Sequence, residues 1–320
     1  MNAKSSSSSH ADPDGLARRR SWRQSDSPVL RSWAGSRIAQ VSSVVLVLSL
    51  LAALLAPWLA VQNPYDPATL ELLDAFTRPT QEGLSGARYL LGADDQGRDV
   101  FSAIVYGLRM SVAVGVSAVL LSLLIGVPLG MAAGYFGGWF DSAVMRIADV
   151  QLTFPVLLVA LLIFGIARGI LPAGYRDDMA VYVIVVAIAL SDWVQYARTV
   201  RGAVMVEKQK DYVAAARLIG RSRTAILARH ILPNLAAPVL VIATISFALA
   251  IVTESTLSYL GVGLPPTEPS LGTLIRIGQG FLFSGEWWIL LYPALTLLAL
   301  ALSVNLVGDW LRDALNPKLQ

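Results

Sequence analysis

Apolar residues gather into six long runs, and charged residues are concentrated in the stretches between them. An α-helix needs about 20 residues to cross the hydrocarbon core of a bilayer, and each run is close to that length. The pattern therefore predicts an all-α polytopic membrane protein. Its six predicted transmembrane helices are Ile38–Val61, Met110–Ala133, Val144–Ile166, Met179–Tyr196, Leu235–Val252 and Trp288–Leu306.

The third of these helices has an unusual start, because two charged residues, Arg146 and Asp149, fall in its first turns. Residues three apart share a helix face, so the two side chains could form an ion pair. Alternatively, the helix begins later, near Val150. Further along, Pro155 predicts a kink, which is tolerated in a membrane when neighbouring groups satisfy the freed carbonyl.

Lysine and arginine are unevenly distributed between the loops, and they mark cytoplasmic segments. An arginine-rich arm, residues 1–37, precedes the first run and is predicted to be disordered and cytoplasmic. Segment 197–234 carries eight cations against Glu207 and Asp211, and six crossings place it on the same side. The eight cations are Arg198, Arg201, Lys208, Lys210, Arg217, Arg221, Arg223 and Arg229. We therefore expect both termini to be cytoplasmic, with loops 62–109, 167–178 and 253–287 outside.

The long first outer loop ends in its own helical pattern. Val100, Ile104 and Leu108 recur every four residues and predict one apolar helix stripe. Asp94 or Asp95 is expected to cap this helix. Together with Arg98 and Asp99, these two residues form a polar cluster that could bind a ligand. We favour a structural role for the cluster in capping and ion pairing.

Composition supports the membrane assignment and excludes several kinds of site. The 320 residues are 55% hydrophobic and 15% charged, with a mean hydropathy of +0.59 and a net charge of +3. Soluble domains average about 25% charged residues. The chain lacks cysteine and has only two histidines, His10 and His230. This excludes disulfides and thiolate sites and argues against a histidine-built metal cage.

Segment 211–234, DYVAAARLIGRSRTAILARHILPN, interrupts the apolar runs with a short basic helical hairpin. Its alanine-rich stretch, Asp211–Ile219, predicts a helix, since alanine has the highest helix propensity. Gly220 is expected to end that helix in a left-handed conformation. A second helical stretch, about Ser222–Ile231, leads to Pro233. Composition alone favours a basic amphipathic helix lying on anionic lipid.

The order of residues favours a different interpretation, because the segment resembles the EAA motif of permease subunits of bacterial ATP-binding-cassette importers. Ala214-Ala215-Ala216, Gly220 and Leu232-Pro233 fall at the spacing of that motif. Two positions depart from it: Ala214 replaces the usual glutamate, and His230 replaces an apolar residue. Further segments are similar to the C-type subunit of dipeptide and oligopeptide importers. These segments are LLGADDQGRDVFSAIVYGLRMS, TFPVLL, QYARTVRG, TESTLSYLGVGLPPTEPSLG and GDWLRDALNP.

The resemblance implies a type I importer permease fold. The resemblance covers most of residues 30–317 and does not extend to the serine-rich N-terminus. The apolar runs and the charge pattern divide the chain into a basic arm (1–37), a first transmembrane helix (38–61), an extracytoplasmic loop (62–109) and a five-helix permease core (110–306). The core contains the EAA-type cytoplasmic loop 197–234, and a cytoplasmic tail (307–320) follows. The implied partners are a second permease subunit in a heterodimer, two ATP-binding subunits, an extracytoplasmic substrate-binding protein and the lipid bilayer of the bacterial inner membrane. Nucleic acid is not expected as a partner.

We expect that the chain is not an enzyme and that it has no catalytic or metal-binding residues. It contains no phosphate-binding Gly-x-x-x-x-Gly-Lys-Ser/Thr motif, so ATP and Mg²⁺ are expected on the partner subunits. The residues expected to couple to the ATPase are Asp211, Tyr212, Ala214, Ala215, Ala216, Gly220, Arg221 and Arg223. The elbow residues are His230, Leu232 and Pro233.

Candidate residues of a translocation path come chiefly from the third and fifth predicted helices. They are Asp149, Gln151, Thr153, Thr244 and Ser246, together with Glu254, which follows the fifth helix and could meet a peptide amine or the binding protein near the outer face. For each of them, an interhelical hydrogen bond worth about 1 kcal/mol is the alternative interpretation. Three other functions remain open at this point. They are a nickel or other small-solute importer of the same family, an ATP-independent secondary transporter, and a membrane anchor that grips lipid through its basic loop.

Overall fold

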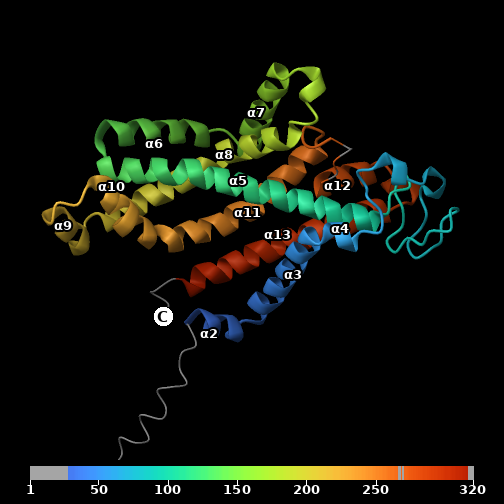
Figure 1. Ribbon diagram of the computed structural model, residues 1–320, viewed down its shortest axis with the longest axis horizontal. Helices are drawn as coiled ribbons and strands as arrows, with labels where there is room; N and C mark the ends of the chain where they lie inside the picture. Colours follow the sequence, from blue (N-terminus) through green and yellow to red (C-terminus); the bar gives the residue numbers. More distant parts are fainter. Residues whose placement is uncertain (1–27, 266–267, 269, 316–320) are drawn as a thin grey trace, which may run out of the picture.

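The protein is all-helical in a computed structural model that describes residues 28–265, 268 and 270–315 (Figure 1). Most of the predicted arm and the end of the tail lie outside the described residues. Short 3₁₀ turns and one π-helical turn join the α-helices. The α-helices are α2 (Pro28–Gly35), α3 (Arg37–Leu54), α4 (Ala56–Leu59), α5 (Val100–Phe136), α6 (Gly138–Leu152), α7 (Val156–Ile170), α8 (Ala180–Glu207), α9 (Asp211–Leu218), α10 (Arg223–Ile226), α11 (Ala236–Tyr259), α12 (Leu271–Gln279) and α13 (Trp288–Ala314).

Five helices of the described chain are long and apolar enough to cross a membrane, and the bent pair α6–α7 brings the number to six. The five long helices each contain most of one of the other five predicted spans. Four of them extend past the predicted span at one or both ends, whereas α3 stops at Leu54, short of the predicted end at Val61. Large apolar side chains stay exposed along them, as on α3 at Ile38, Leu48 and Leu54. Such an apolar exterior suits a lipid environment and would be costly in water.

Helices α5 and α8 pack backbone to backbone along a stripe of glycines. Gly126, Gly130 and Gly134 are spaced four apart on α5, and a Cβ atom on any of them would lie within 3.0 Å of atoms of α8. At Gly130 the nearest atom is the carbonyl oxygen of Ala197, at 2.4 Å. Small residues at this spacing let transmembrane helices approach closely without a hydrophobic driving force. This contact fixes α8, whose C-terminal part forms the start of segment 197–234.

The third predicted span is a broken one, because α6 and α7 meet at an angle of 97°. Proline has no N–H group and biases the preceding residue toward extended backbone, and Pro155 lies at the break as the N-cap of α7. The missing N–H of Pro155 frees the Gln151 carbonyl, which accepts from the Phe154 amide at 3.2 Å instead. The predicted position of the kink is confirmed, but the bend is so large that two helices replace one.

The start of α6 also differs from expectation. The helix begins at Gly138, well before Val150. Asp149 pairs with Arg198 of α8, so the predicted ion pair with Arg146 is wrong. An i, i+3 neighbour on an exposed helix contributes only about 0.2–0.5 kcal/mol, which leaves the carboxylate free to turn toward the facing helix.

The outer segment that precedes α5 is held by buried polar groups. Arg98 and Asp94 form a buried ion pair with Nε and Oδ2 2.6 Å apart. Asp99 is the N-cap of α5 and accepts from the Ser102 amide at 2.8 Å, so the prediction that Asp94 or Asp95 caps this helix is wrong. Asp94 lies too far from the helix start, and it closes the preceding turn instead by accepting from the Gln96 amide. The structural role expected for this cluster is confirmed for Asp94, Arg98 and Asp99.

Candidate functional site

Helix α9 forms a short arm that projects beyond the transmembrane helices beside α10 (Figure 1). Asp211 occupies its first turn, where a negative charge complements the helix dipole. Gly220 follows the C-terminal end with φ of +76°, in the left-handed region that glycine enters without steric cost. The predicted helix and its glycine stop are both confirmed, within one residue at the C-terminal end.

One face of α9 is anchored inside the protein. Val213 and Ala216 are buried in an apolar cluster with Val204 of α8 and Ile231. The anchoring of α9 therefore depends on side chains from both α8 and the segment that enters α11.

Polar contacts strengthen the anchor. The Tyr212 hydroxyl donates to Glu207 at the end of α8 and accepts from the Asn234 amide at 2.9 Å. Lys210 pairs with the same Glu207 carboxylate at 2.5 Å. Burial, followed by the hydrogen bond to Glu207, raises the pKa of the Tyr212 hydroxyl above its ordinary value, so the group stays protonated as a donor. These bonds tie the start of α9 to the C-terminal end of α8 and to the turn that enters α11.

The elbow between α9 and α11 is more irregular than the predicted helical stretch. Helix α10 spans four residues and is followed by a π-helical turn, Leu227–Ile231, and a 3₁₀ turn, Leu232–Leu235. The Asn234 side-chain amide donates to the His230 carbonyl at 2.9 Å and so bridges the π-helical turn and the 3₁₀ turn. His230, Leu232 and Pro233 thus lie where an elbow was predicted.

The opposite face of α9 is exposed, and its polar side chain is Asp211, since Arg217 lies at the edge of this face over the Tyr135 ring. Ala214 and Ala215 are exposed, and they lead to Leu218 and Ile219, whose exposed fractions are 88% and 76%. Sequence reasoning missed these two apolar residues as surface groups. Ala214 and Leu218 are four apart and share a helix face, but the sequence does not say which face of the helix is covered, because that depends on the packing of Val213 and Ala216.

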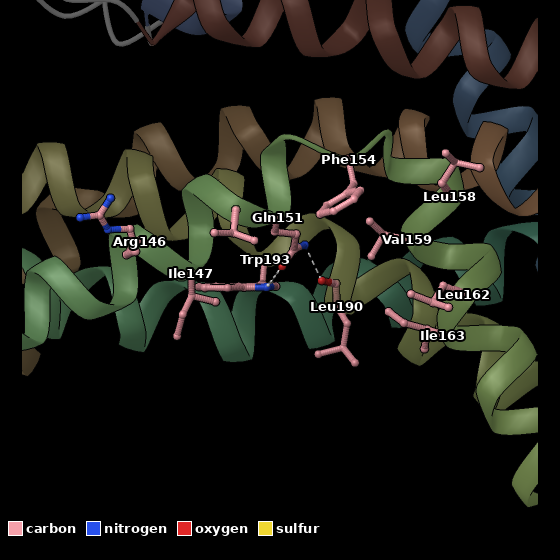
Figure 2. A pocket seen from close by; sticks show the side chains of 11 residues that line it. Arg146, Ile147, Gln151, Phe154, Leu158, Val159, Leu162, Ile163, Leu190 and Trp193 are labelled. Carbon is pink, nitrogen blue, oxygen red and sulfur yellow. Dashed lines mark hydrogen bonds between the residues drawn. The ribbon is translucent and has the colours of Figure 1, made fainter.

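Among the predicted path residues, Gln151 lines an apolar hollow of about 650 Å³ at the α6–α7 break (Figure 2). The Gln151 amide donates to the Leu190 carbonyl at 2.7 Å and accepts from the Trp193 indole at 2.9 Å. Asp149 and Thr153 are exposed near the same break. The hollow is lined chiefly by apolar side chains, with Arg146 at one end.

The remaining three path residues lie inside the bundle. Glu254 is fully buried and accepts from the hydroxyls of Ser111 and Ser258, each at 2.8 Å. Ser246 is also fully buried, and the partly buried Thr244 donates to the Val241 carbonyl at 2.8 Å. The hydrogen bonds of Glu254 join α5 to α11, which is the interhelical alternative considered from the sequence.

A bundle of five or six apolar helices with a projecting anchored arm defines a multi-pass membrane protein. A sequence model described as "Binding-protein-dependent transport system inner membrane component" matches residues 126–320. The chain belongs to this family of inner-membrane transport subunits, and it is a transport subunit rather than an ATPase.

Individual relatives are similar over nearly the whole chain. The Di/tripeptide transport system permease protein DppC of Pseudomonas aeruginosa (strain UCBPP-PA14) is 37% identical, over 91% of each chain. The Oligopeptide transport system permease protein OppC of Bacillus subtilis (strain 168) is 37% identical, over 89% of this chain and 87% of the relative. A solved structure of the MetNI methionine ABC transporter in an inward-facing conformation is similar in fold, with 18% identity and a TM-score of 0.53. That match covers 68% of this chain and 97% of the other.

Proposed function

We propose that this chain is the subunit through which di- or oligopeptides cross the bacterial inner membrane, driven by ATP hydrolysed on separate subunits. The observation that carries the coupling part of the proposal is the exposed face of α9. The opposite face of this helix is buried at Val213 and Ala216. The peptide cargo is proposed because relatives that are 36–37% identical are named for dipeptide, di/tripeptide and oligopeptide transport.

The proposed docking surface consists of the exposed residues Asp211, Ala214, Ala215, Leu218 and Ile219. Small and apolar side chains allow a groove on the ATPase to close tightly over the helix, as in other helix-in-groove contacts. Tyr212 and Ala216 do not belong to this surface. They hold α9 in place, because Tyr212 is hydrogen-bonded to Glu207 and Ala216 is buried. Gly220 sets the direction in which the chain leaves the surface.

Force would pass from α9 to the membrane through its two anchors. Closure of two ATP-bound subunits would draw α9 toward its counterpart on a second permease subunit. The Glu207–Tyr212–Asn234 bonds would then move α8 and α11 with α9 as rigid bodies. A binding protein on the opposite side would deliver the peptide into the space between the two permease subunits. We place the exposed Asp149 and Thr153, with Gln151, on the wall of that space.

This proposal requires α9 and both termini to be cytoplasmic. The chain has no cysteine, so a single cysteine introduced at the exposed Ser222 can be labelled without background. We expect an impermeant maleimide to label it in inverted membrane vesicles and not in intact cells. Labelling in intact cells would overturn the orientation and the coupling role together.

Co-purification tests the coupling surface directly. We expect the solubilised chain to carry two ATPase subunits and a sister permease, and Ala215→Asp to release the ATPase subunits. Ala228→Asp makes the same chemical change at an exposed alanine outside α9 and should leave the complex intact. Retention of ATPase by the Ala215 variant, or ATP-independent peptide flux by the chain alone in liposomes, would contradict the proposal.

A further inference from the structure

Beside α9 lies a second feature, which we call the arginine hollow. It is a cavity of about 430 Å³ lined by Tyr135, Phe136, Arg217, Arg221, Arg223 and Ile226. The two aromatic residues end α5, Arg217 belongs to α9, and Arg223 opens α10. Figure 1 shows these ends together at one extremity of the bundle, where α5 turns into α6. Three guanidinium groups therefore converge on one space from separate elements.

No carboxylate among the residues that the structure describes neutralises the three arginines. Within the described part of the chain, none of them forms an ion pair. The two acidic residues of segment 197–234 are placed elsewhere. Glu207 is engaged by Lys210 and Tyr212, and Asp211 lies at the far end of α9 from Arg217.

One of the three arginines is held in position by the wall of the hollow. The Arg217 guanidinium lies over the Tyr135 ring, 5.5 Å from its centroid. This is within the range of a cation–π contact. The hollow is thus a cationic site with a fixed aromatic side.

Its depth relative to the membrane follows from α5. Phe136 is the last residue of that membrane-spanning helix, and Trp139 follows at the start of α6 with 83% of its surface exposed. Exposed aromatic residues at the ends of apolar helices mark the level of the lipid head groups. The arginine hollow opens at that level.

We propose that the arginine hollow binds the phosphate of an anionic phospholipid in the adjacent leaflet. Guanidinium groups donate in pairs to phosphate oxygens, and the aromatic wall can contact the upper acyl chain or glycerol. This reassigns Arg221 and Arg223, which the sequence led us to expect on the ATPase. The apolar face of α9 and the cationic hollow then serve two different partners, a protein and a lipid, on one short segment.

Native mass spectrometry of the full chain, purified with the subunits that accompany it, can count the retained lipid. The probes are phosphatidylglycerol and phosphatidylcholine, added in equal amounts. An arginine near a membrane surface contributes about 1 kcal/mol to binding anionic lipid, which corresponds to roughly fivefold in affinity. We expect preferential retention of phosphatidylglycerol, and roughly 25-fold weaker retention in the double variant Arg221→Gln/Arg223→Gln.

Arg229→Gln is the matched control, because it removes an exposed arginine of the same segment that does not line the hollow. It should retain phosphatidylglycerol like the parent chain. An equal loss in this control, or unchanged retention in the double variant, would overturn the proposal. Equally tight binding of glycerol 1-phosphate alone would show a free-anion site, and loss of ATPase subunits with the lipid retained would show a protein contact. Either result would also overturn the lipid assignment.

The result can be read separately from the proposed transport function. Ala215→Asp is expected to release the ATPase subunits and keep the lipid. The double variant Arg221→Gln/Arg223→Gln is expected to lose the lipid and keep the ATPase subunits. Failure of one expectation leaves the other standing, because the two sets of residues lie on different surfaces of the segment.

Discussion

Replacing Gly130 with alanine would place a methyl carbon 2.4 Å from the Ala197 carbonyl oxygen and 2.9 Å from the Ala197 Cα. Both neighbours are backbone atoms, so no side chain can rotate away. Restoring an ordinary contact of about 3.4 Å requires α5 and α8 to separate by about 1 Å, and overpacking of this kind costs about 1–3 kcal/mol. Alanine also has a higher helix propensity than glycine, which offsets about 1 kcal/mol of that cost.

A control on the facing helix separates these two effects. Gly202 lies within α8 and has nothing within 4 Å of a Cβ position, so Gly202→Ala gains helix propensity alone. We therefore expect the Gly130 variant to be less stable than the Gly202 variant by about 1–3 kcal/mol. Equilibrium unfolding in mixed micelles with a denaturing detergent measures the difference. Equal stabilities would refute the view that backbone contact between α5 and α8 holds the bundle together.

Two further predictions concern buried carboxylates. The Asp74 carboxylate lies outside the spans, and although burial opposes it, hydrogen bonds from Ser85 and the Tyr89 hydroxyl hold its pKa below the ordinary value. Its stabilising contribution is therefore complete above about pH 4 and is lost as the pH falls through the lowered pKa. Asp74→Asn should reduce this loss of stability at low pH, which is measured as the pH dependence of hydrogen-exchange protection in the outer segment before α5. An unchanged pH dependence would refute the assignment. Glu254→Ala should destabilise the bundle by about 1–3 kcal/mol, because the Ser111 hydroxyl loses its buried acceptor. Unfolding measurements that show no loss would place Glu254 outside the helix contacts.

Features that depend on neighbouring residues along the chain were predictable. The six apolar runs, the stop at Gly220 and the proline break at Pro155 each rest on local propensity or on hydrophobic length. The sequence predicted Asp94 or Asp95 as the N-cap of α5, whereas the N-cap is Asp99. Three aspartates precede the helix within a few residues, and each of them is a favourable N-cap residue.

Features that depend on distant residues were not predictable. Asp149 pairs with Arg198, 49 positions away, and no periodicity within one helix carries that information. The outward orientation of Leu218 and Ile219 depends on Val213 and Ala216 being covered by side chains of α8 and of the segment entering α11.

By itself the amino-acid sequence determined that the chain is an all-α membrane protein with a short helical arm ended by glycine. Helix length, hydropathy and glycine conformation are properties of consecutive residues, so they can be read without a fold. The tertiary structure alone decided which face of the arm is free, that three arginines converge beside Tyr135, and that α6 and α7 meet at 97°. These features arise because side chains from separate helices compete for the same space, and that competition is settled only once the helices are packed.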